Sequence, residues 1–423
     1  MSVTRISTAS IHSYGIAEMM RQQVALSKTQ AQISSGQRVQ TPADDPVAAT
    51  RILGLERAQS QLDQYGRNAG IAGDRLSLGE QSMADLTTIM QRVQELTVKA
   101  NDGALDNTSL QSIATELRSR KQEMLDIANR QDSNGEFLFA GFSTGTRPFA
   151  DSSVGVAYAG DQGVRQLQIS SSQKIADSFN GERVFMDIPQ GNGTFMVTSG
   201  THTGTGMIGA GQVLDGAQWS AAAAAVVAPA THEYTVRFID PDLDGVADTW
   251  ELLDSTGTAV ENPPGTPVRG SYVDGGAISF DGIQFTLSGK PAVGDTFEVA
   301  PAASESLFTT LDNLIASLDA GSNSPGSNAL LGSSINQALT QLDRGLNHVI
   351  DLRTDIGARL SALDTAEGLR NDLSDELTGS LSELRDLDYA EAISRLNQQM
   401  TGLQAAQAAY SRIGQLSLFD YIR

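Results

Sequence analysis

Both ends of the chain carry an apolar seam that is too thin for a helix to bury alone. Near the C-terminus, apolar residues recur three, four and seven positions apart, which predicts one face of a helix: Ile393, Leu396, Met400, Leu403 and Tyr410. A second seam of similar width, interrupted by glutamines, lies near the N-terminus: Ile16, Met19, Leu26 and Ile33. Because packing supplies most of the stability of a helix, each seam needs a partner. We predict that the two ends pair as an antiparallel coiled coil that packs against other molecules; the alternative is that they dock on a globular core of the same chain.

Helical patterns continue inward from both ends. Asp45-Pro46 predicts a helix start, because aspartate accepts the first free amides and proline suits the first helical position. Beyond it, Leu76, Met83, Met90 and Thr97 repeat every seven residues, and so do Ile335, Leu342, Val349, Ile356 and Leu363 on the C-terminal side, up to a break at 385–388. Residues 136–141 are interpreted as a strand that begins a hairpin. The two helical halves are expected to complete each other as a long antiparallel rod.

The middle of the chain has a different composition. Short runs of β-branched and aromatic residues alternate with turns rich in Gly, Asp and Asn, a pattern typical of strands: 194–198, 232–239, 249–253, 277–280, 283–287 and 296–300. The prediction is a mainly α fold with an inserted β domain. Its three parts are a terminal coiled coil (1–40 with 386–423), a helical rod with a β-hairpin (41–179 with 301–385) and an outward-facing β domain (180–300).

Charge and composition exclude several classes of function. The formal net charge is −21 and no basic tract is present, so nucleic acid and anionic membranes are poor partners. No apolar run reaches the length of a membrane span. The chain contains no cysteine, which excludes disulfides, thiolate zinc sites and cysteine nucleophiles. No spacing of nucleophile and base indicates catalysis, so we expect a protein that is not an enzyme.

One acidic segment matches a calcium-binding loop. Oxygen donors stand at the first, third, fifth, ninth and twelfth positions, with Gly245 at the sixth: Asp240, Asp242, Asp244, Asp248 and Glu251. The flanking residues, however, are predicted to form strands rather than the helices of a helix–loop–helix hand. Two interpretations therefore remain open: a calcium site, which would make calcium the one cofactor, or a solvated acidic hairpin turn.

Several motifs together resemble a known family. Residues 32–49, QISSGQRVQTPADDPVAA, and 92–100, RVQELTVKA, resemble the N-terminal signature of bacterial flagellins and their hook-associated relatives. The segments 135–142 (GEFLFAGF), 388–396 (DYAEAISRL) and 416–422 (LSLFDYI) are more similar to the hook-associated protein 3 family of hook–filament junction proteins. The resemblance covers roughly the first 150 and the last 110 residues of the chain.

This resemblance implies a secreted structural adaptor of the extracellular bacterial flagellum, exported by the flagellar type III apparatus with a cytoplasmic chaperone. It implies a ring of identical subunits that contacts a neighbouring hook-associated protein and flagellin, assembled through the paired ends. Two other readings stay open. One is a filament-forming flagellin, which would polymerise by itself. The other is a calcium-dependent binding module at the tip of the β domain.

Overall fold

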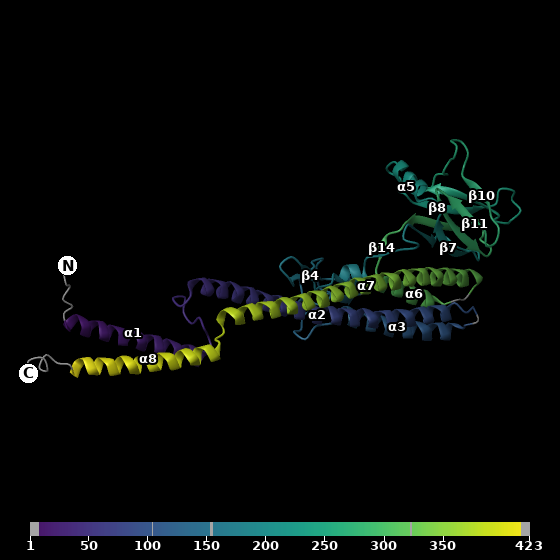
Figure 1. The fold of residues 1–423 in the computed structure, drawn as a ribbon. Helices are drawn as coiled ribbons and strands as arrows, with labels where there is room; N and C mark the ends of the chain where they lie inside the picture. The colour runs from purple at the N-terminus through teal and green to yellow at the C-terminus, as the bar shows by residue number, and fades with distance from the viewer. Residues whose placement is uncertain (1–7, 104, 153–154, 322–323, 416–423) are drawn as a thin grey trace, which may run out of the picture. The chain divides into compact units, whose positions relative to one another are not determined.

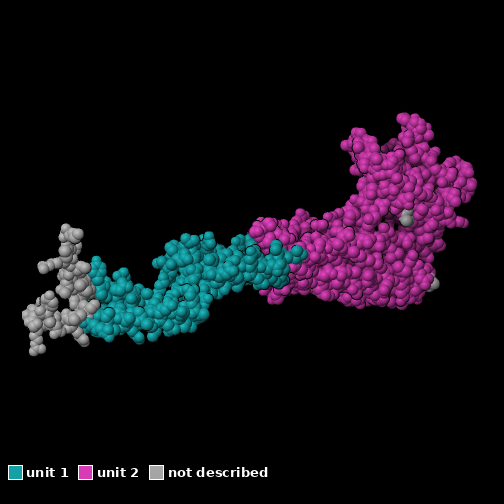
Figure 2. All heavy atoms as spheres, in the orientation of Figure 1, with its two compact units in different colours: residues 1–68, 365–423 teal, residues 69–364 magenta. Residues whose placement is uncertain are grey.

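The computed structural model describes residues 8–103, 105–152, 155–321 and 324–415. It divides into two compact units, which are described separately (Figure 2). Unit 1 contains residues 1–68 and 365–423, and unit 2 contains residues 69–364. The division into three parts from the sequence stays a prediction. The mainly α architecture with an inserted β domain is confirmed (Figure 1).

Unit 1 is built from the two ends of the chain. Helix α1 (Thr8–Ser35) lies beside helix α8 (Tyr389–Gln415), with the first turns of α2 (Pro46–Ala100) and the last turns of α7 (Pro325–Arg385) in the same unit (Figure 1). Gly15 faces Tyr410 and Gln22 faces Gly402, so the two helices run in opposite directions. The predicted antiparallel pairing of the chain ends is confirmed. The C-terminal motif at 416–422 lies outside the described residues.

The helix boundaries in unit 1 follow from local chemistry. Helix α1 ends at Ser35, and Gly36 follows with a φ of 69°, a conformation that glycine adopts without strain. Helix α2 begins at Pro46, and the Asp45 carboxylate accepts a hydrogen bond of 3.0 Å from the amide of Ala48. Helix α7 ends at Arg385, inside the predicted break. The start at Pro46 and the break after Arg385 were predicted from the sequence.

Unit 2 contains a helical part in which α2 and α7 are joined by α3 (Asn107–Ala128) and α6 (Leu307–Ala320). Helices α3 and α6 lie side by side. The seven-residue repeats of α2 and α7 are buried, which confirms that they form the packed faces: Leu76, Met83, Met90, Thr97, Ile335, Leu342, Val349, Ile356 and Leu363. The helix that begins at Pro46 and the repeat at 76–97 belong to one continuous helix, α2.

Between α3 and the β domain, the chain forms short hairpins and an aromatic cluster. The hairpins are β1 (Phe149–Ser152) with β2 (Gly155–Tyr158), and β3 (Gln166–Gln168) with β4 (Lys174–Ala176). The short helix α4 (Gly181–Phe185) follows. The rings of Phe139, Phe149, Phe185 and Phe308 pack together, with Phe139 and Phe185 edge to face at 5.3 Å between centroids.

The strand predicted at 136–141 is wrong. This segment makes only isolated bridges, at Phe137 and Ala140, and turns between them. The turn lets the consecutive residues Leu138, Phe139 and Ala140 all be buried, whereas a strand would point alternate side chains to opposite faces. The first hairpin begins later, at Phe149.

The β domain contains two antiparallel sheets. The five-stranded sheet has the order β10 (Arg269–Ser271), β9 (Thr249–Asp254), β8 (Tyr234–Ile239), β13 (Thr296–Pro301) and β6 (Phe195–Ser199). The three-stranded sheet has the order β11 (Ala277–Phe280), β12 (Ile283–Ser288) and β7 (Met207–Val213). Their shared core includes Phe238, Phe285 and Phe297, together with Trp219 of helix α5 (Gly216–Ala225).

A pair of two-residue strands connects the β domain to the helices of unit 2. Strand β5 (Ile188–Pro189) enters the domain, and β14 (Ser304–Glu305) leaves it. The two strands pair antiparallel, with Ser304 opposite Pro189 and Glu305 opposite Ile188. Within the described part of the chain, none of the helices combines the length and the apolar character that crossing a membrane would require.

Candidate functional site

The residues of the predicted assembly seam lie on α1 and α8, and they divide into two groups. The half-buried group faces the other helix of the pair: Met19, Leu26, Ile33, Leu396, Leu403 and Tyr410. The second group is exposed: Ile16 is 39% exposed, Ile393 48% and Met400 42%. The pair therefore buries only part of its own apolar seam.

Further apolar side chains, which the sequence reasoning missed, extend this exposed surface. They are Tyr14, Met20 and Val24 on α1, each more than 60% exposed. The spacing of four positions places Met20 and Val24 on one face of α1, whereas Tyr14 lies six positions before Met20 and on a different face. We use the name outer stripe for the exposed apolar side chains of the two helices: these three residues with Ile16, Ile393 and Met400.

Small and polar residues lie beside these half-buried apolar side chains in the contact between α1 and α8. Ala392 and Thr29 are among its most buried members, and Gly15 leaves room for the ring of Tyr410. The side-chain oxygens of Gln22 and Gln399 are buried without a hydrogen-bond partner. Buried polar atoms without partners cost free energy, so this contact adds little stability to unit 1 on its own.

The corner of unit 1 ties the two chain ends together. The amide of Leu387 donates to the carbonyl of Gly36 at 2.9 Å, across an antiparallel bridge between Gln37 and Asp386. Beside it, Lys28 pairs with Asp44 at 2.6 Å. The pKa of the Asp44 carboxyl is lowered, first by this contact with Lys28 and then by the amide of Thr41. The corner is therefore a defined structure rather than a loose linker.

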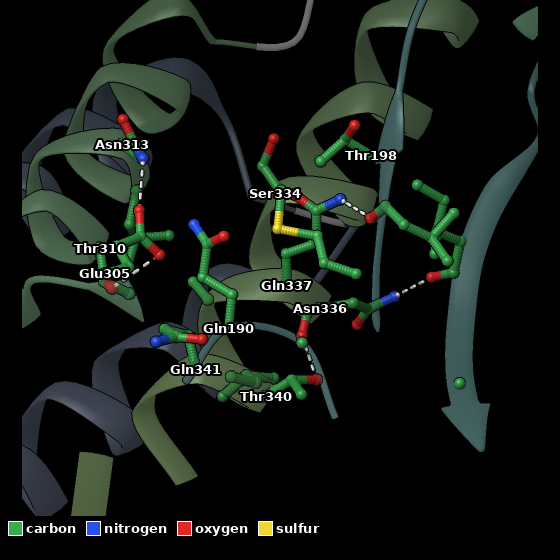
Figure 3. Close-up of a pocket in the computed structure, with 18 of the residues that line it drawn as sticks. Gln190, Thr198, Glu305, Thr310, Asn313, Ser334, Asn336, Gln337, Thr340 and Gln341 are labelled. Carbon is green, nitrogen blue, oxygen red and sulfur yellow. Dashed lines mark hydrogen bonds between the residues drawn. The ribbon is translucent and has the colours of Figure 1, made fainter. Parts of the chain in front are cut away.

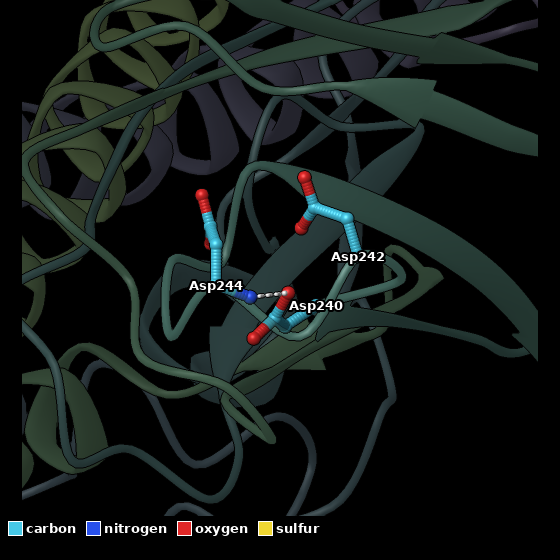
Figure 4. Close-up of side chains that lie close together, drawn as sticks. All are labelled: Asp240, Asp242 and Asp244. Atoms are coloured by element: carbon cyan, nitrogen blue, oxygen red, sulfur yellow. Dashed lines mark hydrogen bonds between the residues drawn. The ribbon is translucent and has the colours of Figure 1, made fainter.

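The predicted calcium loop follows β8, and the structure brings three of its five carboxylates together. One oxygen from each of Asp240, Asp242 and Asp244 lies within 4.8 Å of the others (Figure 4). Asp240 also accepts hydrogen bonds from the amides of Asp244 and Gly245, which curl the loop around it. The pKa of Asp242 is raised, because its carboxyl shares a hydrogen bond with Asp240 and lies beside the charge of Asp244.

The other two predicted ligands are elsewhere. Glu251 is buried on β9, where its carboxylate accepts hydrogen bonds from Arg237 at 2.8 Å and from Arg269 at 3.0 Å. Asp248 accepts a hydrogen bond from the hydroxyl of Thr249 and is not part of the three-carboxylate group. Because the flanking segments are strands, the twelfth position of the loop becomes part of the sheet and points to its arginines.

Known protein families match the two helical ends of the chain. The bacterial flagellin N-terminal helical region matches residues 6–144, and the bacterial flagellin C-terminal helical region matches residues 335–422. Flagellar hook-associated protein 3 of Escherichia coli strain K12 is 24% identical over 417 residues, which cover 98% of this chain and 99% of that protein.

Two crystal structures are similar over most of the described fold. FlgL of Xanthomonas campestris is 30% identical, with a TM-score of 0.68, and the match covers 78% of this chain and 99% of that one. The flagellar junction protein FlgL of Legionella pneumophila is 28% identical, also with a TM-score of 0.68, and the match covers 79% of this chain and 99% of that one.

Helices from both chain ends around an inserted β domain define a flagellin-like structural protein. Within that class, the chain belongs to the flagellar hook-associated protein 3 (FlgL) family.

Proposed function

We propose that the chain is a structural subunit of the extracellular bacterial flagellum that joins the hook to the filament. The observation that carries this proposal is the outer stripe of unit 1. Six large apolar side chains on a thin helix pair remain in contact with water, while the side-chain oxygens of Gln22 and Gln399 are buried in the pair without a hydrogen-bond partner. Such a pair gains stability when neighbouring molecules cover it. The similar protein of Legionella pneumophila is named a flagellar junction protein, which supports the same role.

In this proposal the neighbours are further copies of the chain in a ring, a hook-associated protein on one side and flagellin on the other. A cytoplasmic export chaperone would cover the same stripe before export. A helix pair with little stability of its own suits export, because a chain must be unfolded to pass a narrow channel and can order when partners supply the missing surface. The family is structural, which agrees with the expectation that the chain is not an enzyme.

Replacing outer-stripe residues tests this proposal. Ile393→Asp with Met400→Asp places charges on exposed positions, so unit 1 should keep its fold while assembly onto the hook is lost. Leu396 and Leu403 are half-buried against α1, and aspartate there would also unfold the pair. The matched control is Asn397→Asp with Gln404→Asp, two exposed polar positions with the same spacing on α8. Normal filaments on cells that carry the Ile393 and Met400 variant would refute the proposal.

A filament-forming flagellin is the second candidate. The flagellin helical regions that match both ends of the chain are the observation that favours it. A flagellin polymerises by itself when seeded, whereas a junction subunit needs the hook. Sedimentation of the purified chain, with and without short filament seeds, distinguishes the two functions: growth of long filaments from this chain alone would select flagellin.

We also propose that the group of Asp240, Asp242 and Asp244 binds calcium weakly. The raised pKa of Asp242 supports this, because a divalent cation would relieve the repulsion among the three carboxylates. Asp244→Asn should then weaken calcium binding measured by calorimetry, while Glu251→Gln should leave it unchanged because Glu251 is paired with arginines. If calorimetry detects no heat of binding at millimolar calcium, a solvated acidic turn is the correct interpretation.

A further inference from the structure

A cavity of about 860 Å³ lies in unit 2 between the β domain and helices α6 and α7. Three walls enclose it: strands β6 and β7, helix α6 around Thr310–Ser317, and helix α7 around Ser334–Gln341. Its floor is formed by Gln190 and Glu305, next to the paired strands β5 and β14 (Figure 3). A volume of this size is typical of sites for small organic ligands.

The polar groups in this cavity are almost all uncharged. Amides and hydroxyls dominate: Gln190, Asn192, Thr198, Thr310, Asn313, Ser317, Ser334, Asn336, Gln337, Thr340 and Gln341. Among the described residues that line the cavity, none carries a positive charge and Glu305 is the one carboxyl group. This lining does not suit phosphate or carboxylate ligands, which need cations, or a divalent metal ion, which needs several carboxylates.

The lining also disfavours an extended peptide. Strands β6 and β7 are the free edges of their sheets, where a peptide could add as a new strand. Helix α7 already occupies these edges: Gln337 donates to the carbonyl of Val197 at 2.7 Å, and the hydroxyl of Ser333 accepts a hydrogen bond of 3.2 Å from the amide of Ile208. In Figure 3 the side chains of Gln337 and Asn336 point toward the strands rather than into the open space.

Several polar groups remain directed at the cavity. Gln190 lies between the group of Glu305, Thr310 and Asn313 on one side and Gln337 on the other (Figure 3). The side-chain nitrogen of Asn192 is buried without a partner. Asn313 and Thr310 hold the Glu305 carboxylate at 3.2 and 3.3 Å, so its position is fixed before any ligand arrives. Carboxamides offer a donor and an acceptor side by side, as the neighbouring hydroxyls of a sugar do.

We propose that this cavity binds a neutral oligosaccharide of two or three sugar rings, recognised through its hydroxyl groups. The hydroxyls of the sugar would be held by Gln190, Asn192, Thr198 and Glu305. The apolar side chains of Met196 and Leu314 would contact the faces of the rings. The sugar could be free in solution or part of a longer surface glycan, since the chemistry is the same. This inference stands apart from the proposed junction role, because it involves unit 2 and not the outer stripe of unit 1.

The test uses the full chain and three neutral trisaccharides: maltotriose, cellotriose and triacetylchitotriose. Calorimetry and saturation-transfer NMR should detect binding of at least one, and 3′-sialyllactose should bind less well because the cavity offers its carboxylate no cation. A polysaccharide that contains the bound unit, used in a pull-down, separates a glycan chain from a free sugar as the natural source. Either source agrees with the proposal.

Two variants locate the binding. Gln190→Leu removes a central amide and should raise the dissociation constant about tenfold, because one to two well-made hydrogen bonds are lost. Thr198→Val keeps the shape of the side chain and removes one hydroxyl, so a smaller loss is expected even if the Gln190 variant folds poorly. The matched control, Gln81→Leu, removes an exposed amide on α2 and should bind as the unaltered chain does.

Three results would overturn the proposal. The first is that none of the trisaccharides binds at about 10 mM, a concentration at which even weak sites are occupied. The second is that binding occurs but is unchanged in both the Gln190 and the Thr198 variants, which would place it elsewhere. The third is that tetraglycine binds while the sugars do not, which would make the cavity a peptide site. These three results concern binding to the purified chain and not the assembly of filaments, so the proposed function is tested separately.

Discussion

The backbone amide of Arg38 donates a hydrogen bond of 2.7 Å to the carbonyl of Arg385, 347 positions further along the chain. This contact joins the turn after α1 to the end of α7. The guanidinium of Arg38 also donates to the carbonyl of Leu384, which otherwise would lack a partner at the end of its helix. The two breaks in the helical pattern therefore stabilise each other, and the start of α8 is fixed relative to the end of α1.

Gly36 is the residue at this corner that is most sensitive to substitution. Its φ of 69° is unfavourable for other residues, so Gly36→Ala should destabilise unit 1 by about 1–2 kcal/mol. Hydrogen exchange at the amides of α1 and α8 should become faster in this variant. The control is Gly54→Ala on α2, where a new methyl group meets no atom within 4 Å and should stabilise the helix by about 0.5–1 kcal/mol. Equal exchange rates in the two variants would contradict the role of the corner.

Arg75 holds a buried group of carboxylates in unit 2. It lies against Asp132, Glu136 and Asp177, and its own side chain is only 5% exposed. Arg75→Leu leaves the buried Asp132 without its cation, although Arg165 still pairs with Asp177 and Glu136, so the free energy of unfolding should fall by about 3–5 kcal/mol. Arg92→Leu, which removes an exposed pair with Glu116, should cost less than about 1 kcal/mol. Urea denaturation measures the free energy of unfolding of both variants. Similar losses would show that the buried ion pairs of Arg75 contribute no more stability than the exposed pair of Arg92.

His202 is an unfavourable residue in the β domain. Its ring is almost fully buried against Phe297, and both ring nitrogens lack hydrogen-bond partners. His202→Leu should therefore raise the stability of the domain by about 1 kcal/mol, because no buried polar atom is left without a partner. His348→Leu should give no such gain, since Nε2 of His348 bonds the carbonyl of Arg183 at 2.7 Å. A lower melting temperature for the His202 variant would contradict this prediction and would indicate a favourable interaction of Nδ1 with the Asp295 carboxylate, which lies 3.9 Å away.

Glu305 gives unit 2 a defined dependence on pH. Burial raises the pKa of its carboxyl, so the folded chain holds the proton more tightly than the unfolded chain does. The stability that this proton contributes is complete below the ordinary pKa of glutamate and is lost as the pH rises through the raised value. Glu305→Gln should therefore be more stable than the unaltered chain near neutral pH and equally stable in acid.

The control for this prediction is Glu298→Gln, an exposed carboxyl on β13 of the same domain. Comparing each variant with the unaltered chain at every pH removes the general effect of the net charge of −21. A stability difference for Glu305→Gln that does not change between acid and neutral pH would refute the assigned role of burial.

Much of the helical architecture could be predicted because its signals are local or periodic. Gly36, Asp45 and Pro46 define helix ends through their own backbone chemistry. The repeats through Met83 and Leu342 are periodic because they face a core along their whole length. Six of the strands of the β domain were also predicted, since runs of β-branched and aromatic residues between turn residues indicate them locally.

Other features could not be predicted because they depend on contacts distant in sequence. Strand β7 contains glycines such as Gly209, where a side chain would collide with Thr286 of the neighbouring strand, so its sequence lacks the usual pattern. The alanine run of α5 carries no periodicity, yet Trp219 attaches it to the core. Glu251 fits a calcium loop by spacing alone. In the structure it pairs with Arg237 and Arg269, which come from two other strands.

The assembly seam illustrates both cases. The sequence predicts that Ile393 and Leu396 belong to one narrow stripe, but the structure separates them: Leu396 is half-buried, and Ile393 is exposed. A seven-residue repeat does not by itself state which of two adjacent positions faces the partner helix. That distinction depends on how the two helices are rotated against each other, which the contacts of Gly15 with Tyr410 and of Gln22 with Gly402 define.

The most direct test of the junction role is to delete the gene in its source bacterium and to score hooks, filaments and flagellin in the medium. We expect hooks without filaments and flagellin released as monomers. We also expect that the unaltered gene restores filaments and that the Ile393→Asp, Met400→Asp variant does not. Intact filaments on the deletion strain would contradict the junction role, and hooks that release no flagellin would identify this chain as the flagellin itself.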